Sequence, residues 1–285
     1  MKLGNLDITH AQKERLSYID FSLEYFGLIG RKELMQHFGT SSDSCTRDFS
    51  LYNKLAPNNA TFKHQDKKYH RTMSFKTLFH HDANVVLNIL SKGFGNGLYP
   101  EVSRNPSVTF MDSCIININS LAVIYRAILS FVSVEIEYYT QEESTLSLTI
   151  FPHTLFEGYR GWYVRAFNTP RKQYQNFSLL HILNVKAAEQ LMPMSDVRRN
   201  DSQWNEQINL RLEPHRTIKN ISAIETMFNM SNGELVIHTN RVLAIHVLKT
   251  LNVELCKQKQ NCSKKFYLSL LNTDELEGIE LLFKE

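Results

Sequence analysis

The segment GYRGWYVRAF, residues 158–167, constrains the fold more than any other short stretch of this chain. Apolar and polar side chains that alternate with period two are typical of a half-buried β-strand. The core face is predicted to carry Trp162, Val164 and Ala166, and the opposite face Tyr163, Arg165 and Phe167. We therefore expect a strand whose aromatic and basic face suits a binding surface.

Neighbouring segments predict further strands with few helices between them. Residues 132–140 alternate as a strand, and a short apolar helix is predicted before them at 119–131. Residues 147–168 indicate two strands joined near Glu157–Gly158, and residues 174–191 indicate a strand that runs into a helix. Several strands packed with few helices predict a small, strongly bent sheet or barrel.

The first quarter of the chain has a different pattern. Residues 12–29 are amphipathic with helical spacing. Two helices are predicted at 31–38 and 42–55, separated by a short turn at Gly39–Thr40, and a hairpin with a charged tip is predicted at 60–72. Helix, short turn with glycine, helix and hairpin are the order of a winged helix-turn-helix that binds DNA.

The exposed face of the second helix and the hairpin tip supply candidate DNA contacts. Ser and Thr hydroxyls suit phosphates and bases, and Arg suits guanine or phosphate. The candidates are Arg31, Ser42, Ser44, Cys45, Thr46, Arg47, Tyr52, Lys54, His64, Lys67 and Lys68. Phe49 and Leu51 are expected to face the core. Arg47 has a second interpretation, in which it only pairs with Asp43 or Asp48.

The distribution of charge agrees with a DNA-binding N-terminal part. Residues 1–72 hold 11 Lys and Arg against 8 Asp and Glu, whereas the remainder holds 21 of each. The whole formal excess of +3 therefore lies in the first quarter, as expected for a segment that meets a polyanion. On charge alone, a solvated surface with a chance asymmetry fits nearly as well.

Connecting segments are also visible. Residues 73–92 predict another helical stretch, and residues 93–106, rich in Gly, Asn and Pro, predict a linker. The polar connector SDVRRNDSQ contains Asp196 and Asp201, with Glu206 nearby, and suggests a metal site for a nuclease. A solvated linker is the simpler interpretation.

The sequence contains no catalytic motif that we can identify. G-x-S-x-G, H-E-x-x-H and a P-loop are absent, and the four Cys form no C-x-x-C pair. We therefore predict no enzyme, no cofactor and no metal. No run of about 18 apolar residues is present, and the N-terminal stretch lacks an apolar core, so we expect a cytoplasmic protein without a membrane partner.

The order of motifs resembles a WYL domain. A helix is followed by V-x-I-x-Y, I-x-P-H-x-L, G-W-Y-V-R-A-F and N-F-x-L-x-x-I, and the namesake tripeptide stands here as Trp162-Tyr163-Val164. The N-terminal R-L-x-Y-I-D-F, the run from F-G to L-A-P at 38–57 and the run from P-H to R-G-W at 152–162 are similar to one branch. That branch is the BrxR and CapW type of regulator, found beside phage-defence systems such as BREX and CBASS.

The resemblance implies an α+β protein with three domains. It implies a winged helix-turn-helix at 1–72, a helical linker at 73–117, an Sm-like β-barrel WYL domain at 118–192 and a C-terminal α/β extension for dimerisation at 193–285. It further implies a transcriptional repressor that binds a palindromic operator in double-stranded DNA as a homodimer. The gene under control would be a BREX-like or CBASS-like phage-defence locus, and the protein would associate with the nucleoid through DNA.

The resemblance also implies a ligand pocket in the WYL domain. The matching positions are Ser144, His153, Tyr163, Arg165 and Gln175, and Phe167 adds a second ring beside Tyr163 for stacking. Arg offers a forked set of donors, aromatic rings stack on bases, and His is sensitive to pH, so a nucleotide or nucleic-acid fragment is the expected ligand. Gln175 and His181 stand where basic residues are usual, which favours a less charged ligand or lost sensing.

Other interpretations stay open. Tyr163 and Arg165 fit a role in covering the open face of a sheet, and His153 fits a hydrogen-bonded structural histidine. A ligand-binding accessory factor of a defence complex, with vestigial DNA binding, is the second functional candidate. A transcriptional activator fits the same residues, whereas an enzyme acting on nucleic acid has the weakest support.

Overall fold

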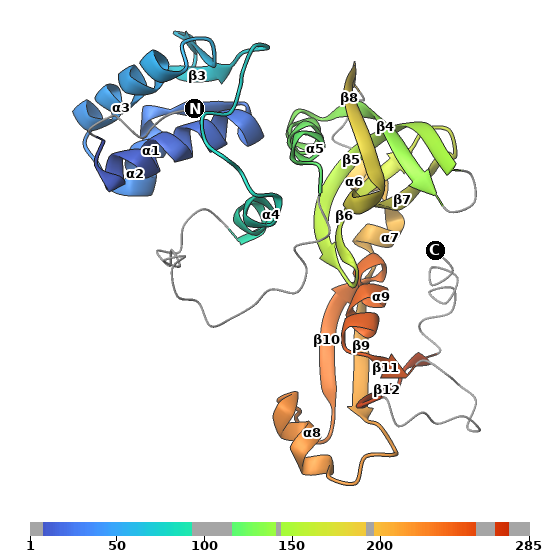
Figure 1. Ribbon diagram of the computed structural model, residues 1–285. Helices are drawn as coiled ribbons and strands as arrows, with labels where there is room; N and C mark the ends of the chain where they lie inside the picture. Colours follow the sequence, from blue (N-terminus) through green and yellow to red (C-terminus); the bar gives the residue numbers. More distant parts are fainter. Residues whose placement is uncertain (1–7, 93–115, 141–143, 192–196, 255–265, 274–285) are drawn as a thin grey trace. The chain divides into compact units, whose positions relative to one another are not determined.

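A computed structural model describes residues 8–92, 116–140, 144–191, 197–254 and 266–273 (Figure 1). The chain forms two compact units, and each is described by itself. The first unit consists of Met1–Pro152, Phe167–Gln173 and Leu179–Met192. The second unit consists of His153–Ala166, Tyr174–Ser178 and Pro193–Glu285.

The first unit begins with the helical segment predicted at 12–29. Helix α1 (His10–Phe21) continues into a π-helical turn, η1 (Ser22–Phe26). The Thr9 side chain caps α1 by accepting a hydrogen bond from the backbone N–H of Gln12. Gly27, with φ +79°, ends the π-helical turn.

Both helices of the predicted helix-turn-helix are confirmed as α2 (Arg31–Phe38) and α3 (Ser42–Leu55). Gly39 ends α2 with φ +62°, a left-handed conformation in which a side chain with Cβ is strained. Ser41 caps α3, because its hydroxyl accepts a hydrogen bond from the Ser44 N–H at 3.3 Å. Gly39 and Ser41 thus fix the turn between α2 and α3.

The predicted hairpin is confirmed as β2 (Ala60–Lys63) and β3 (Lys68–Arg71). β3 also pairs with β1 (Leu28–Gly30), which gives a three-stranded sheet of order β1-β3-β2. Phe49 of α3 stacks on Tyr69 of β3 with ring centroids 4.3 Å apart. The hairpin is therefore fixed to α3 as the wing of a winged helix.

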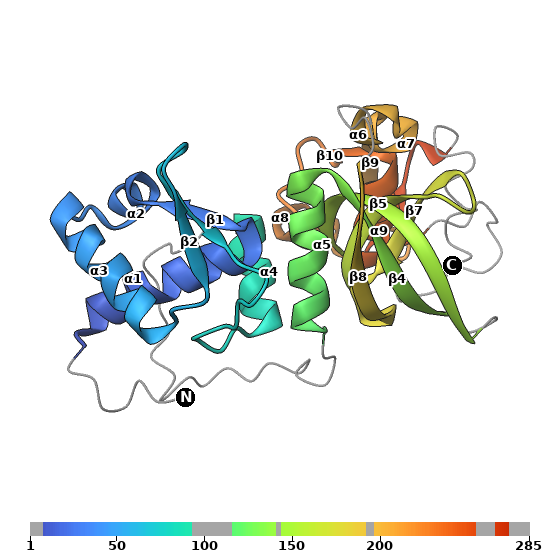
Figure 2. The same ribbon diagram turned by 90° about the horizontal axis from the view of Figure 1, so that it is seen from above.

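One hydrophobic core joins these elements, and Figures 1 and 2 show α1, α2 and α3 grouped beside the wing. Its buried members are Leu16, Ile19, Leu23, Ile29, Leu34, Cys45, Phe49, Tyr52 and Phe75. Phe49 is buried and Leu51 packs against this cluster, as predicted for both.

The helix predicted over 73–92 is only partly present, since α4 spans Ala83–Lys92. The chain before it is irregular because the buried Asp20 carboxylate accepts hydrogen bonds from the backbone N–H groups of Leu78 and Phe79, at 3.0 and 3.1 Å. A side chain of α1 thus takes the donors that a helix would have used. The linker predicted at 93–106 lies outside the described residues.

A five-stranded sheet of order β7-β6-β5-β4-β8 follows helix α5 (Ile118–Ser130). Its strands are β4 (Val132–Thr140), β5 (Ser144–Gly158), β6 (Gly161–Asn168), β7 (Gln173–Ser178) and β8 (Ile182–Leu191). β5 runs from the first unit into the second. Among the described strands the sheet is open at β7 and β8, so the closed barrel stays a prediction.

The helix predicted in the second half of residues 174–191 is wrong, because this segment is β8. β8 pairs antiparallel with β4, and Val134 lies opposite Ala187 and Ile136 opposite Val185. Backbone pairing with a strand more than 40 residues away in sequence outweighs the helix propensity of VKAAEQL.

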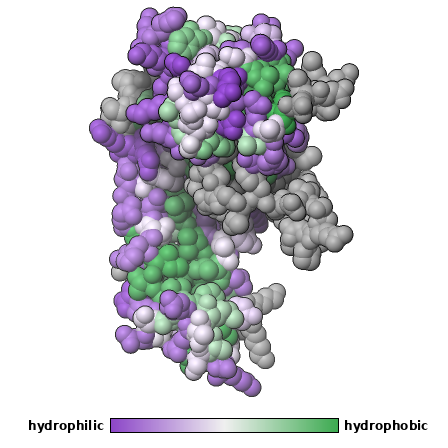
Figure 3. All heavy atoms as spheres, turned by 90° about the vertical axis from the view of Figure 1, so that its left-hand side faces the viewer, coloured by the Kyte–Doolittle hydropathy of each residue, from purple (hydrophilic) through white to green (hydrophobic). Residues whose placement is uncertain are grey.

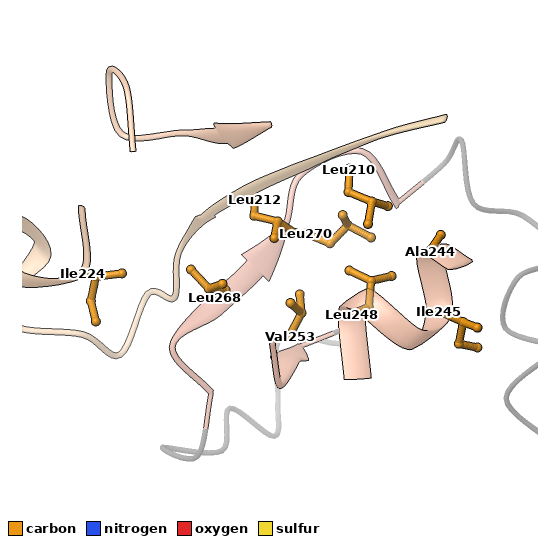
Figure 4. Close-up of a cluster of buried hydrophobic side chains, with 9 residues drawn as sticks. All are labelled: Leu210, Leu212, Ile224, Ala244, Ile245, Leu248, Val253, Leu268 and Leu270. Carbon is orange, nitrogen blue, oxygen red and sulfur yellow. The ribbon is translucent and has the colours of Figure 1, made fainter. Parts of the chain in front are cut away.

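The C-terminal part of the second unit contains a four-stranded sheet of order β10-β9-β12-β11. The strands are β9 (Gln207–Pro214), β10 (Leu235–Asn240), β11 (Val253–Glu254) and β12 (Leu268–Leu270), and the helices are α6 (Val197–Asn200), α7 (Ser202–Asn205), α8 (Ile221–Met227) and α9 (Arg241–Thr250). Figure 4 shows Leu248 of α9 beside the strand side chains of Val253, Leu268 and Leu270, which belong to the same buried core. No helix in the described part of the chain is long and apolar enough to cross a membrane.

Candidate DNA interface and WYL motif site

The two faces of α3 differ sharply in exposure. Phe49 lies in the core, whereas most of the predicted DNA contacts point to solvent. The exposed members of the predicted set are Arg31, Ser42, Thr46, Arg47, Lys54, His64 and Lys67. Ser44 and Lys68 are half-buried. These side chains come from α2, α3 and the wing turn.

Two predicted DNA contacts are buried instead. Cys45 and Tyr52 are each 0% exposed, since they lie at helical spacing from Phe49 and share its core face. The Tyr52 hydroxyl donates to Asp20 Oδ1 at 2.5 Å and accepts from Asn59 Nδ2 at 3.0 Å. Burial, together with the Asp20 carboxylate, raises the pKa of Tyr52. Both residues stabilise the domain and do not reach its surface.

Arg47 keeps its guanidinium at the surface. Its Nε donates to the Asp43 backbone carbonyl at 3.4 Å. The Asp48 carboxylate is held by Arg15, whose Nε lies 2.6 Å from Asp48 Oδ2. Asp48 therefore forms a buried pair with Arg15 of α1 and does not pair with Arg47.

Arg31 ties α2 to the exposed face of α3. Its NH1 donates to Thr46 Oγ1 at 3.3 Å. Lys32, Ser50 and Lys63 are exposed on α2, α3 and β2, and they extend the predicted set. Ser50 lies one helical turn after Thr46, and this spacing is the sequence signal for adding Ser50 to the set.

The wing turn is shaped by a carboxylate. Asp66 accepts a hydrogen bond from the Lys68 N–H at 3.1 Å and contacts His70 Nε2 at 2.6 Å. Lys68 Nζ lies 2.5 Å from Glu33 Oε1, so part of its charge is already paired with α2. His64 and Lys67 remain the exposed groups of the predicted tip.

On the motif strand β6, the core face is largely as predicted. Val164 and Ala166 are each 0% exposed, and Trp162 is half-buried. The opposite face is covered as well, because Arg165 is only 2% exposed.

The Arg165 guanidinium is held by a carboxylate from the connector. Its Nε donates to Asp201 Oδ2 at 2.6 Å and its NH2 to Asp201 Oδ1 at 2.9 Å. NH2 also donates to Gln203 Oε1 at 3.0 Å, and NH1 to Asn176 Oδ1 at 3.2 Å. The Tyr174 ring centroid lies 5.9 Å from the guanidinium carbon. This is a bidentate, charge-assisted pair in a buried setting.

The connector was expected to be solvated, but Asp201 is 1% exposed. It is the N-cap of α7, where Oδ1 accepts the Trp204 N–H at 3.2 Å. Burial opposes its ionisation, yet the hydrogen bonds from His153 and Arg165 outweigh burial and lower the pKa of Asp201 to about 2. The sequence signal for this role is an Asp three residues before Trp204, because Asp is a favoured N-cap residue at the start of a helix. Asp196, the other acid considered, lies outside the described residues.

His153 shares the same carboxylate. Its Nε2 lies 3.2 Å from Asp201 Oδ2, and its Nδ1 lies 2.9 Å from Thr154 Oγ1. Burial lowers the pKa of His153 although Asp201 acts against that shift. A neutral ring that donates from Nε2 and accepts at Nδ1 satisfies both contacts. The ring also meets Trp204 edge to face at 5.6 Å.

Tyr163 belongs to a neighbouring aromatic cluster. It stacks on Phe156 at 5.5 Å and lies 4.9 Å from the His246 ring of α9. The Tyr159 N–H donates to His246 Nδ1 at 3.3 Å. A Cβ on Gly158 would come within 2.6 Å of the same nitrogen, so glycine is required there for close approach.

The remaining predicted pocket residues are placed by their strands. Ser144 is the first residue of β5 and pairs with Thr140 in the sheet register. Phe167 on β6 and Gln175 on β7 are half-buried. The β7 residue that contacts Arg165 is Asn176, the neighbour of Gln175.

Three family models match consecutive parts of this chain. The BrxR transcriptional regulator winged helix-turn-helix domain matches residues 11–92, the WYL domain matches 119–187, and the BrxR transcriptional regulator C-terminal dimerization domain matches 207–276. The chain is a WYL-domain regulator of the BrxR type. Its α+β fold thus combines a winged helix, a WYL domain and a BrxR C-terminal domain.

Curated relatives of this BrxR-type regulator carry the name DNA-binding transcriptional repressor CapW. The one from Pseudomonas aeruginosa is 29% identical, covering 94% of this chain and 91% of the relative. Those from Stenotrophomonas maltophilia and Escherichia coli are 27% and 28% identical, covering 88% and 94% of this chain and 86% and 91% of the relatives. A solved structure of proteasome accessory factor B/C from Arthrobacter aurescens covers 100% of this chain and 51% of its own, but a TM-score of 0.27 at 10% identity supports no conclusion.

Proposed function

We propose that this BrxR-type regulator is a DNA-binding transcriptional repressor. The observation that carries the proposal is the exposed face of α3, where Ser42, Thr46 and Arg47 point to solvent while Phe49 anchors the opposite face. Hydroxyl and guanidinium groups on the second helix of a helix-turn-helix are suited to base edges and phosphates. Relatives matched over most of their length bear the name of DNA-binding repressors, which supports the same function.

The wing adds a second contact with the duplex. His64 and Lys67 are exposed at the hairpin tip, and stacking of Phe49 on Tyr69 holds the hairpin next to α3. Contacts of this kind neutralise phosphates and contribute affinity that falls as salt rises. We infer that α3 enters the major groove while the wing touches the backbone or the minor groove.

A homodimer on a palindromic operator is part of the proposal. The matched C-terminal model is that of a dimerization domain. Figure 3 shows a hydrophobic area at the level of β10, whose Val236 is 45% exposed and whose Leu235 and Ile237 are half-buried. Among the described strands, β10 lies at the edge of its sheet. Twofold symmetry in a protein implies twofold symmetry in its operator.

Gel shifts with the promoter region of its own gene test DNA binding. Arg47→Ala is expected to weaken binding by roughly tenfold and to reduce the salt slope by about one. Lys186→Ala removes an exposed cation from β8 and serves as the control with unchanged affinity. DNA binding that shows neither sequence preference nor salt dependence would contradict the proposal.

We further propose the finer parts of the function. The controlled locus is a BREX-like or CBASS-like phage-defence operon, as the family resemblance implies, and the domain limits 1–72, 73–117, 118–192 and 193–285 follow the same resemblance. The WYL motif site senses a nucleotide or nucleic-acid fragment, which the grouping of His153 and Arg165 around one carboxylate supports. A reporter fused to the defence promoter is expected to rise when the regulator gene is deleted, and an unchanged or lower signal contradicts repression.

A further inference from the structure

The guanidinium of Arg165 is nearly saturated by groups of its own chain. Of the five N–H donors of an Arg side chain, four are used, two by Asp201 and one each by Gln203 and Asn176. The two bonds to Asp201 form the parallel fork that guanidinium makes with a carboxylate or phosphate. Arg165 therefore already holds an oxoanion, which the chain itself provides.

The setting of Asp201 resembles that of a bound anion. Its two oxygens receive donors from Arg165, from the His153 ring and from the Trp204 backbone N–H. All these partners are neutral or positive, and the carboxylate is 1% exposed. Another oxoanion of similar size would find the same donors in the same place.

Asp201 is also the N-cap that fixes the short helix α7. Trp204, on that helix, packs in a buried cluster with Phe156 of β5 and Val242 of α9. The position of α7 on the WYL motif strand thus depends on the Arg165–Asp201 pair, and α7 contacts the helix that follows β10.

We propose that Asp201 is an internal occupant of the anion position on Arg165, and that an external phosphate group binds there by displacing it and releasing α7 from β6. The inference rests on ligand sensing at the WYL motif, which belongs to the proposed function, and it names the ligand class. Exchange of one oxoanion for another avoids the large cost of leaving a buried Arg unpaired. Asp201, once released, gains hydration in solvent.

The exchange couples the ligand to the C-terminal domain. Phosphate on Arg165 removes the cap of α7, and Trp204 then loses the backbone anchor that holds it against Val242. The surroundings of α9 and β10 change as a result. A ligand at the motif strand would in this way bias the dimer through differential affinity for two arrangements.

Calorimetry on the full chain tests the displacement, with inorganic phosphate and a 5′-phosphorylated dinucleotide as probes. Asp201→Asn removes the competing charge and is expected to tighten phosphate binding by about tenfold or more. The matched control is Asp48→Asn, which breaks the buried bidentate pair with Arg15 in the winged helix and should give no gain. The double variant Arg165→Gln, Asp201→Asn should lose the gain.

The two probes separate the sources of the phosphate group. An equal gain with both assigns the site to free phosphate, and a larger gain with the dinucleotide assigns it to a nucleic-acid fragment. A folded Asp201→Asn protein that gains affinity for neither probe overturns the proposal.

A second measurement leaves Asp201 in place. The chain has 2 Trp, so Trp162→Phe leaves Trp204 as the sole reporter. Addition of phosphate, or of the dinucleotide, should shift the Trp204 emission to the red as the ring leaves its buried cluster, whereas sodium chloride of equal ionic strength should not. No shift with either probe at concentrations that saturate Asp201→Asn, or up to about 100 mM if that variant fails to fold, overturns the displacement.

The two proposals fail separately. Promoter binding by the unaltered chain, with no phosphate gain in Asp201→Asn, leaves the repressor standing and removes the displacement. If Asp201→Asn gains phosphate affinity but the unaltered chain binds no promoter DNA, the proposed repressor function is rejected and the anion exchange on Arg165 is supported.

Discussion

At the residue scale, the chemistry of a side chain is decided by the partner that covers it. Arg165 and Tyr163 lie on one face of β6, as the alternation of the sequence indicates. Asp201 covers the first and His246 contacts the second, and both come from later parts of the chain. A face that a local pattern marks as open is therefore closed by tertiary structure.

Tyr52→Phe separates stability from DNA contact. The Asp20 carboxylate would lose one donor but keep the N–H groups of Leu78 and Phe79, so the free energy of unfolding should fall by about 1–2 kcal/mol. Because Tyr52 is buried, promoter affinity of the folded protein should stay unchanged. Urea unfolding and gel shifts check both, with Lys186→Ala, an exposed side chain of β8, as the control. A lost promoter affinity with unchanged stability would contradict the assignment.

His246 makes the stability of the second unit depend on pH. Burial, helped by Lys249, lowers its pKa to about 4, while an unfolded His titrates near 6.5. Between these values the unfolded state binds more protons, so stability is lost as pH falls from about 6.5 to 4. The ring is partly solvated, which limits the effect to about 1–2 kcal/mol.

The variant His246→Gln keeps an acceptor for the Tyr159 N–H and removes the titration. Urea unfolding at neutral pH and near the folded pKa should give a smaller loss for His246→Gln than for the unaltered chain. Since His153 titrates in the same direction and is present in both proteins, its contribution cancels. Equal losses in both proteins rule out His246 as the source.

At the element scale, the sequence predicts what local chemistry determines. α2, α3 and the wing were correct because Gly39, the Ser41 cap and the charged hairpin turn act within a few residues. The β8 segment was predicted as a helix because its pairing with β4 is non-local. For the WYL motif site, the motif positions predict His153 and Arg165, but they do not predict Asp201, since nothing near Asp201 in the sequence reveals its partner.

Gly39 tests the turn of the helix-turn-helix. Its φ is +62°, and a Cβ there would meet nothing within 4 Å, so the cost of substitution comes from the backbone alone. Gly39→Ala should lower the free energy of unfolding by about 1 kcal/mol, and Gly39→Asn by less because Asn tolerates this conformation. Chemical unfolding of both variants gives the ranking, with Lys32→Ala as an exposed control on α2. An Asn variant less stable than the Ala variant would show that strain is not the cause.

At the scale of the whole molecule, each of the two units contains one domain that the proposed function requires. The first contains the winged helix and the second the BrxR-type C-terminal domain, while β5 is continuous between them. The proposed recognition of a palindromic operator needs two winged helices, so we expect DNA affinity to depend on association through the C-terminal domain.

Val236→Lys tests that dependence. Val236 is 45% exposed on the edge strand β10, and a charge there would leave a buried, unpaired ammonium in an interface that uses this edge. Dimer dissociation should therefore rise by about tenfold or more in sedimentation equilibrium, and promoter affinity should fall with it. Val85→Lys, a 55% exposed valine on α4, is the matched control and should leave the dimer intact. If Val236→Lys stays dimeric, the dimer interface does not use β10. If Val236→Lys is monomeric and binds the promoter with full affinity, DNA binding does not require the dimer.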